Sequence, residues 1–211
     1  MKNEEKNTGQ AILKAAEELF LEQGFEQTTT KQIAQRAGCN QALLHYYYRT
    51  KDNLFVQIFE EKVKFIATHF LDINLTAQTL EERISQMVEL HFELFRKNPR
   101  LVPFLLKEVL SDPVRVAPIL DKIKQYMVKI FGKIDEALHE EIEKGAARPV
   151  STLNVILTLV SLDMAPFIIA PVLQRVLDLT DEQLDEQLDK RKPEVVEILL
   201  RQIRKSPFEP V

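Results

Sequence analysis

The residues from Gln27 to Lys51 are the stretch of the chain best suited to contact a polyanion. They include four basic residues and no acidic one, whereas the whole chain has 28 Lys and Arg against 32 Asp and Glu. A local basic patch on an acidic protein is typical of a focused contact with nucleic acid, and not of a coat over the whole surface. The basic side chains are those of Lys31, Arg36, Arg49 and Lys51.

Two short helices are predicted within this stretch. Thr30 can cap a helix of about two turns, and Gly38 supplies the left-handed residue that ends it. Asn40 can cap a second helix that runs to about Tyr47. Two short helices joined by a tight glycine turn form the helix-turn-helix layout, which we place at residues 29–48.

The second of these helices carries side chains suited to reading DNA. It begins Asn40-Gln41-Ala42, and small or amide-bearing side chains suit base edges in a major groove. The imidazole and phenol groups at its far end suit phosphates. We therefore predict DNA contacts from Thr29, Thr30, Lys31, Asn40, Gln41, Ala42, Leu43, His45, Tyr46, Tyr47 and Lys51.

The segment from Gln10 to Phe59 resembles the DNA-binding domain of the tetracycline-repressor (TetR) family. The order and spacing hold along the whole segment, with one departure at His45, where the family usually has Tyr or Phe. The resemblance implies a DNA-binding domain over residues 6–66 and a ligand-binding and dimerisation domain over residues 55–211. The matching pieces are Ile12-Leu13-Lys14-Ala15-Ala16, Leu19-Phe20, Gly24-Phe25, Thr29 to Ala34, Ala37-Gly38 and Tyr46 to Leu54.

Helical spacing of apolar residues continues through the rest of the chain. We predict an all-α fold, with an N-terminal three-helix helix-turn-helix domain and a larger C-terminal helical regulatory and dimerisation domain. Residues 1 to about 7 are expected to be a mobile arm, and capping boxes are expected at Thr79 and Thr180. The expected helices cover about 8–23, 51–71, 80–97, 101–110, 117–144, 152–177 and 194–205, with a short helix or linker at 179–190.

The segment 153–173 is the most apolar part of the chain and approaches the length of a membrane span. A charge such as Asp163 near the middle of a span costs about 3 kcal/mol, and Asn154, Pro166 and Pro171 also count against one. We therefore favour a buried interface. The resemblance implies a homodimer formed by the last two major helices, about 152–177 and 193–205. The polar N-terminus lacks a signal-peptide core, and we expect a cytoplasmic protein with no membrane contact.

The helices of the second half carry large apolar residues beside isolated polar ones, a mix that a small-molecule pocket needs. We expect a mostly apolar pocket of several hundred cubic ångströms within residues 55–177. For Asp163 two interpretations stay open, an ion pair across the dimer interface and a polar anchor in the pocket. The predicted ligand contacts are His91, Phe92, Phe95, Phe104, Tyr126, Met127, Asp163 and Phe167.

The chain shows no nucleophile–base arrangement, phosphate loop or metal-spaced cluster, so we predict neither an enzyme nor a cofactor or metal. His139-Glu140-Glu141 begins like a zinc-protease helix but lacks the second His. The resemblance implies a ligand-responsive regulator, a repressor, that binds a pseudo-palindromic DNA operator as a homodimer and is released by a small-molecule effector. The alternatives are a regulator switched by a protein partner and a small helical enzyme.

Overall fold

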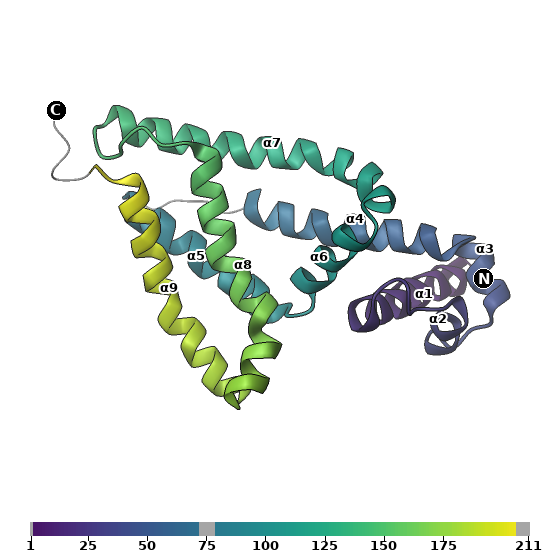
Figure 1. Cartoon of the computed structure of the whole chain (residues 1–211). Helices are drawn as coiled ribbons and strands as arrows, with labels where there is room; N and C mark the ends of the chain where they lie inside the picture. The colour runs from purple at the N-terminus through teal and green to yellow at the C-terminus, as the bar shows by residue number, and fades with distance from the viewer. Residues whose placement is uncertain (1, 72–78, 206–211) are drawn as a thin grey trace. The chain divides into compact units, whose positions relative to one another are not determined.

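The computed structural model describes residues 2–71 and 79–205, and these residues form nine α-helices with no β-strand (Figure 1). An isolated bridge joins Ala147 to Arg204. The all-α prediction is confirmed. The helices are α1 (Lys2–Gln23), α2 (Thr30–Arg36), α3 (Gln41–Tyr48), α4 (Lys51–Leu71), α5 (Leu80–Lys97), α6 (Leu101–Ser111), α7 (Pro113–Glu143), α8 (Thr152–Leu177) and α9 (Asp181–Ile203).

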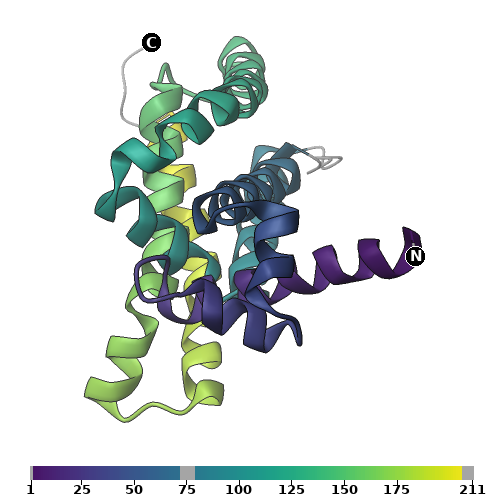
Figure 2. The same ribbon diagram turned by 90° about the vertical axis from the view of Figure 1, so that its right-hand side faces the viewer.

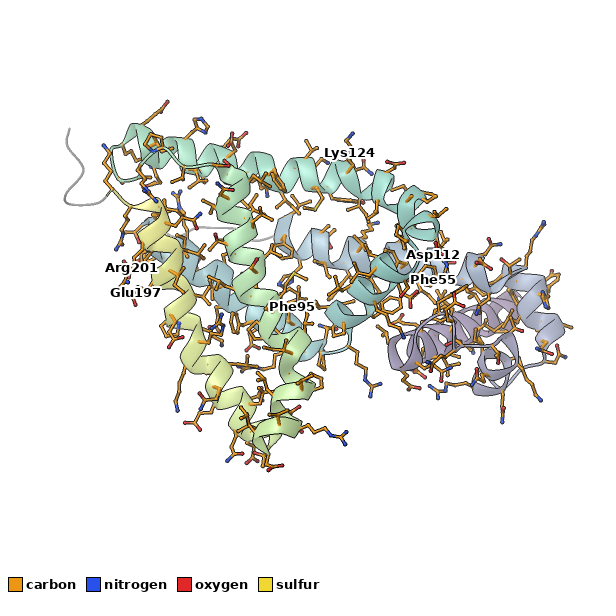
Figure 3. All side chains as sticks on the ribbon, in the orientation of Figure 1. Phe55, Phe95, Asp112, Lys124, Glu197 and Arg201 are labelled. Carbon is orange, nitrogen blue, oxygen red and sulfur yellow. The ribbon has the colours of Figure 1, made fainter. Side chains whose placement is uncertain are left out.

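The first compact unit contains the residues up to Thr68 together with Pro103–Tyr126. Its centre is a group of phenylalanine rings in edge-on or tilted contact, a favourable geometry for aromatic pairs. Phe55 from α4, labelled in Figure 3, lies 5.8 Å from Phe20 of α1 and 6.2 Å from Phe104 of α6, between ring centroids. The segment 103–126, which the domain prediction assigns to the second domain, therefore supplies core side chains to the unit that holds the helix-turn-helix.

The second compact unit contains His69–Val102 and the chain from Met127 onward. Helices α8 and α9 lie side by side and both contact α5 (Figures 1 and 2). The start of α8 is tied to α7 by a hydrogen bond from the Thr152 hydroxyl to Asp135. The buried apolar residues that hold the three helices together include Ile84, Val88, Phe92, Phe95, Val155, Leu159, Phe167, Leu188, Val195 and Leu199.

Side-chain caps set several helix starts. The capping boxes predicted at Thr79 and Thr180 are present, with Glu82 and Gln183 as their partners. The cap of α2 is Thr29 and not Thr30 as predicted. Thr29 has the extended backbone of an N-cap, and its hydroxyl accepts a hydrogen bond of 3.2 Å from the Gln32 amide. Gln32 completes the box by accepting from the Thr29 amide, so Thr30 is the first helical residue.

Helices α1 and α7 begin earlier than predicted. The predicted start of the first helix at about Thr8 is wrong, since α1 begins at Lys2. Helix α7 begins at Pro113 and continues through Pro118, instead of starting at Ala117. Proline is well tolerated at the first helical position, and the Asp112 carboxylate caps the helix by accepting from the Arg115 amide at 3.0 Å.

Helix α9 is continuous where the sequence suggested two segments. It runs through Pro193, whose ring removes one backbone hydrogen bond from the helix interior. Leu188 before the proline and Val195 and Leu199 after it are all buried. The burial of one apolar stripe across the proline outweighs the missing hydrogen bond, because each such side chain contributes about 1.5–3 kcal/mol.

Candidate nucleic-acid interface and buried polar cluster

The turn between α2 and α3 has the geometry of a helix-turn-helix. Gly38 has φ of 68°, a conformation that favours glycine, and the Cys39 amide closes the turn by donating to the Ala34 carbonyl at 2.9 Å. The Asn40 side chain accepts from the Leu43 amide at 2.9 Å, as predicted for the cap of α3. Ile33, Ala34 and Leu44 are buried in the core of the first unit and hold the two helices in place.

The predicted base-reading residues share the exposed side of this motif. Asn40, Gln41, Ala42 and Leu43 at the start of α3 are all exposed. The Gln41 side-chain amide donates to the Thr30 hydroxyl at 3.1 Å, which links the first residues of α2 and α3. An α-helix N-terminus held this way on the surface can enter a major groove with its first side chains toward base edges.

The tyrosines that follow divide between surface and core. Tyr46 is 74% exposed. Tyr47 is half-buried and its ring meets that of Tyr46 edge-on at 5.2 Å. Tyr48 packs, as expected, and donates its hydroxyl to the Gly9 carbonyl of α1 at 2.9 Å. Tyr46 is therefore the member of the run best placed to reach an outside partner.

The His45 ring also has a partner within the chain. Its Nδ1 lies 2.6 Å from the carbonyl oxygen of Arg49, a residue with φ of 64° at the end of α3. A carbonyl can only accept, so Nδ1 carries the proton in this contact, and Nε2 is an acceptor while the imidazole is neutral. Donation from His45 to a phosphate then requires the protonated ring.

Two of the four basic residues are engaged within the protein. Lys51 Nζ donates to the carbonyls of Phe25 and Thr28, each at 2.9 Å, and lies 3.9 Å from the centroid of the Phe25 ring. Arg36 forms an ion pair of 2.8 Å with Glu22 of α1. These partners include backbone carbonyls, which no sequence pattern reveals. The contact of Lys51 with DNA stays a prediction, with two of its three N–H groups already used.

The turn between α1 and α2 is clamped by side chains that the pattern of the sequence did not single out. Glu108 of α6 is 3% exposed and accepts from the Phe25 amide at 3.0 Å. Arg115 of α7 lies over the Phe25 ring, 3.8 Å from its centroid, and pairs with Glu26 and with Asp112, each at 2.8 Å. Hydrogen bonds from the backbone and side chain of Arg115 hold the pKa of Asp112 below its usual range.

In the second unit, five of the predicted ligand contacts come together. His91 of α5 and Asp163 of α8 are each 1% exposed, and His91 Nδ1 lies 2.7 Å from Asp163 Oδ2. The Phe167 ring meets those of Phe92 and Phe95 at 5.6 Å, and Figure 3 labels Phe95. Burial raises the pKa of Asp163, against the hydrogen bond from His91. We call these five residues, His91, Phe92, Phe95, Asp163 and Phe167, the buried polar cluster.

The other three predicted ligand contacts lie outside this cluster. Phe104 and Tyr126 belong to the first unit, where Phe104 packs against Phe55 and Phe59. Met127 is 41% exposed. Helical periodicity marks a residue as apolar-facing but does not say which core it faces, and the ligand contacts of these three residues stay a prediction.

Two surface pockets of the second unit have different linings from the predicted apolar pocket. One has a volume of about 800 Å³ and includes Glu81, Glu82, Lys144 and Arg204. The other, of about 670 Å³, includes Arg148, Glu197 and Arg201. Figure 3 shows Glu197 and Arg201 on the outer side of α9. Neither pocket is lined by Phe95 or Phe167, so a cavity at the buried polar cluster stays a prediction.

Two further features bear on function. Within the part of the chain that the structure describes, no group of three or more His, Cys, Asp or Glu is arranged to hold a metal ion. Helix α8 is long and apolar enough to cross a membrane by length and composition, with 33% of its most apolar window buried. Length and apolar composition are shared by membrane spans and by apolar helices that pack against protein.

Both parts of the chain match known regulator families. Residues 12–58 match the family described as "Bacterial regulatory proteins, tetR family". Residues 81–199 match the family described as "Tetracyclin repressor-like, C-terminal domain". The second match alone spans more than half of the chain.

Several curated relatives are regulators by name. The chain is 26% identical over 137 residues to the Fatty acid metabolism regulator protein of Bacillus subtilis, covering 64% of this chain and 70% of that protein. It is 28% identical over 178 residues to the Probable HTH-type transcriptional regulator YttP of the same organism, covering 81% and 82%. Identity to the regulator QacR of Staphylococcus aureus is 38% over 52 residues, covering 25% and 28%.

Solved structures share the fold over nearly the whole chain. A TetR family transcription regulator from Marinobacter aquaeolei VT8 has a TM-score of 0.67 at 17% identity, covering 98% of this chain and all of that one. HlyIIR, a hemolysin II transcriptional regulator, has a TM-score of 0.61 at 22% identity, covering 96% and 99%. At these identities the likeness supports the fold and not a particular ligand or operator.

Proposed function

Because the chain belongs to the tetR family of bacterial regulatory proteins, we propose that it is a cytoplasmic, homodimeric repressor that leaves its DNA operator when a small molecule binds. The observation that carries the proposal is the exposed N-terminus of α3, where Asn40, Gln41 and Ala42 face outward from a helix-turn-helix held by buried residues. No enzyme is proposed, since the curated relatives are named as regulators.

The proposed DNA contacts divide by chemistry. Gln41 has a carboxamide that can pair with an adenine edge, and Ala42 and Leu43 offer apolar contact to a thymine methyl. Lys31 is exposed, and its ammonium group forms no hydrogen bond or ion pair with the residues that the structure describes. It is a basic residue of the motif that can reach a phosphate. Tyr46 can donate its phenol to a neighbouring phosphate.

Dimerisation is supported by an apolar face of α8 that is exposed in the single chain. Leu153, Leu157, Val172 and Val176 are between 52% and 71% exposed. Residues 193–205 of α9 contribute less than expected to such a face, because Leu199 is buried within its own subunit and Ile198 is 44% exposed. A two-fold dimer built on α8 would place one reading helix at each half-site of a pseudo-palindromic operator.

Helix α4 offers a route between effector and DNA. It is one continuous helix, with Lys51 bonded to the α1–α2 turn at its first residue. Near its other end, Phe70 meets the His91 ring edge-on at 4.1 Å between centroids. A ligand that binds better to one position of Phe70 would shift the balance between two states of α4, as differential affinity requires. The second candidate function is a regulator that is switched by a protein partner bound to the second unit. The exposed apolar face of α8 also favours this alternative.

The test is selection of bound sequences from random duplex DNA, followed by affinity measurements at several salt concentrations. Lys31→Ala should weaken binding to all sequences and reduce the salt slope by about 0.9 for each phosphate that the variant no longer neutralises. Gln41→Ala should relax the preference at one position in each half-site, and discrimination should fall there by about 1–3 kcal/mol. Lys124→Ala is the control, an exposed lysine on α7 (Figure 3).

An unchanged salt slope in Lys31→Ala, together with an unchanged base preference in Gln41→Ala, would place the DNA contact on another surface. If Lys124→Ala reduced the salt slope by the same amount, the effect of Lys31→Ala would come from the net charge of the protein and not from a contact at the helix-turn-helix.

A further inference from the structure

The buried pair of His91 and Asp163 presents two polar atoms that the protein itself does not satisfy. One atom of each side chain is used in the 2.7 Å contact between Nδ1 and Oδ2. The outer atoms, His91 Nε2 and Asp163 Oδ1, are buried and have no hydrogen-bond partner among the described residues. Buried polar groups are nearly always hydrogen-bonded, so two orphan atoms on one pair need an explanation.

A purely structural tie between α5 and α8 does not supply one. Each unsatisfied buried group costs about 1–3 kcal/mol, and apolar residues of similar volume would join two helices at least as well. The rings that meet His91, those of Phe70 and Phe95, offer neither atom a hydrogen-bond partner. The charge of Arg191 reaches Asp163, but no hydrogen bond satisfies Oδ1. An apolar enclosure with a few polar atoms is the composition of a small-molecule site.

The hydrogen-bonding capacity of the pair selects the ligand. With Asp163 as a carboxylate, His91 Nδ1–H is the donor of the 2.7 Å bond, which leaves Nε2 and Oδ1 both as acceptors. An amine head group can donate one N–H to each of these two acceptors, whereas an alcohol O–H can donate to only one of them. A carboxylate head would bring further acceptors and a like charge to the buried Asp163, which already interacts with the charges of His91 and Arg191.

We propose that His91 and Asp163 form the polar end of the effector site, which takes an apolar molecule whose head group is a hydrogen-bond donor, an amine or an alcohol. The proposal rests on the ligand response proposed above. Phe70 is half-buried whereas Phe92 and Phe95 are almost fully buried. The head group therefore reaches His91 by displacing Phe70, near the end of α4.

Three probes with one chain length and different head groups test this chemistry: octylamine, 1-octanol and octanoate. Thermal unfolding of the full-length protein is measured with each probe, without DNA. Octylamine and 1-octanol should raise Tm by several degrees at saturation, and octanoate should not, because binding to the native state stabilises it by mass action. Asp163→Asn and His91→Gln should each abolish the increase.

Glu108→Gln is the matched control, since it neutralises a buried carboxylate of the first unit and should retain the full probe response. If Asp163→Asn does not fold, ¹⁵N NMR of the wild-type histidines replaces it. Octylamine should shift the Nε2 resonance of His91, and octanoate should leave it unchanged. A pair that only joins two helices would show no difference between the two probes.

The proposal is overturned if octanoate stabilises as well as octylamine, if no probe raises Tm, or if Asp163→Asn keeps the amine response. In those cases the pair is only a tie between helices. None of these measurements involves DNA, so a failure here leaves the proposed operator binding intact, and a failure of operator selection leaves this result intact.

Discussion

At the scale of single residues, the structure distinguishes glycines that are required from those that are not. Gly24, at the end of α1, has φ of 84°, and an added Cβ would lie 2.5 Å from Lys107 Nζ and 3.2 Å from Glu108 Oε1. Gly132 lies inside α7, and an added Cβ would meet nothing within 4 Å. The same substitution should therefore have opposite effects at the two positions.

We expect Gly24→Ala to lower the free energy of unfolding by at least about 1–2 kcal/mol, the cost of a left-handed conformation for alanine. Displacement of the Glu108 carboxylate from the Phe25 amide should lower it further. Gly132→Ala should raise the free energy of unfolding by about 0.5–1 kcal/mol, because alanine is the better helix former. Urea denaturation of both variants measures the difference, and a stabilised Gly24→Ala would contradict the clamp described above.

Asp163 makes stability depend on pH. Burial raises the pKa of its carboxyl in the folded state above the unfolded value, so the folded protein holds this proton more tightly. Its contribution is then fully present below the ordinary Asp pKa near 4 and is lost as pH rises through the folded pKa. Asp163→Asn should remove this dependence, so its stability relative to wild type should increase as pH rises above about 4. Denaturant titrations of both proteins from pH 4 to pH 8 test this prediction. If the difference in the free energy of unfolding between Asp163→Asn and wild type stays constant with pH, the prediction is wrong.

At the scale of elements, α4 is anchored to the α1–α2 turn by its first residue. Lys51 satisfies the carbonyls of Phe25 and Thr28, which follow the end of α1 and precede the cap of α2. A single ammonium group thus links three helices of the first unit. Lys51 lies at the end of the basic stretch of the sequence, and this position suggested a phosphate contact. The backbone carbonyls that it binds instead cannot be inferred from the pattern of side chains.

Lys51→Met keeps most of the aliphatic stem and removes the charge. It should lower the free energy of unfolding by about 1–3 kcal/mol, since the two carbonyls would be left without their donor. Lys31→Met is the control on an exposed position and should change stability by less than about 0.5 kcal/mol. Thermal unfolding compares the two. Equal stability with a reduced salt slope for DNA would instead assign Lys51 to the phosphate contact.

At the scale of the whole molecule, the proposed dimer rests on the exposed apolar face of α8. A substitution at buried Leu199, such as Leu199→Arg, would unfold the subunit before it reported on an interface. Val172 and Val114 form a better pair, since they are 61% and 83% exposed on α8 and α7 respectively.

Val172→Glu should convert the dimer into monomers, because each copy would place a charge against an apolar surface and close to its own symmetry mate. Val114→Glu should leave the dimer unchanged. Sedimentation velocity, with circular dichroism to confirm folding, measures both. A dimer that survives Val172→Glu would place the interface away from this part of α8.

The sequence alone was enough to predict the all-α class, the helix-turn-helix at residues 29–48, the two capping boxes at Thr79 and Thr180, and the packing of Tyr48. Apart from the packing of Tyr48, whose hydroxyl bonds to Gly9, 39 positions away, these features rest on interactions between residues a few positions apart, and local patterns report them directly. The predicted cap at Thr30 missed by one residue because adjacent threonines offer the same hydroxyl.

Only the tertiary structure showed which core each apolar residue joins. Phe104 packs with Phe55 in the first unit, Glu108 binds the Phe25 amide, and His91 meets Asp163 across helices α5 and α8. Helix α9 passes Pro193 because buried residues on both sides outweigh one missing hydrogen bond. Contacts between residues 72 or 83 positions apart depend on how helices pack, and helical periodicity gives the face of each residue without its partner.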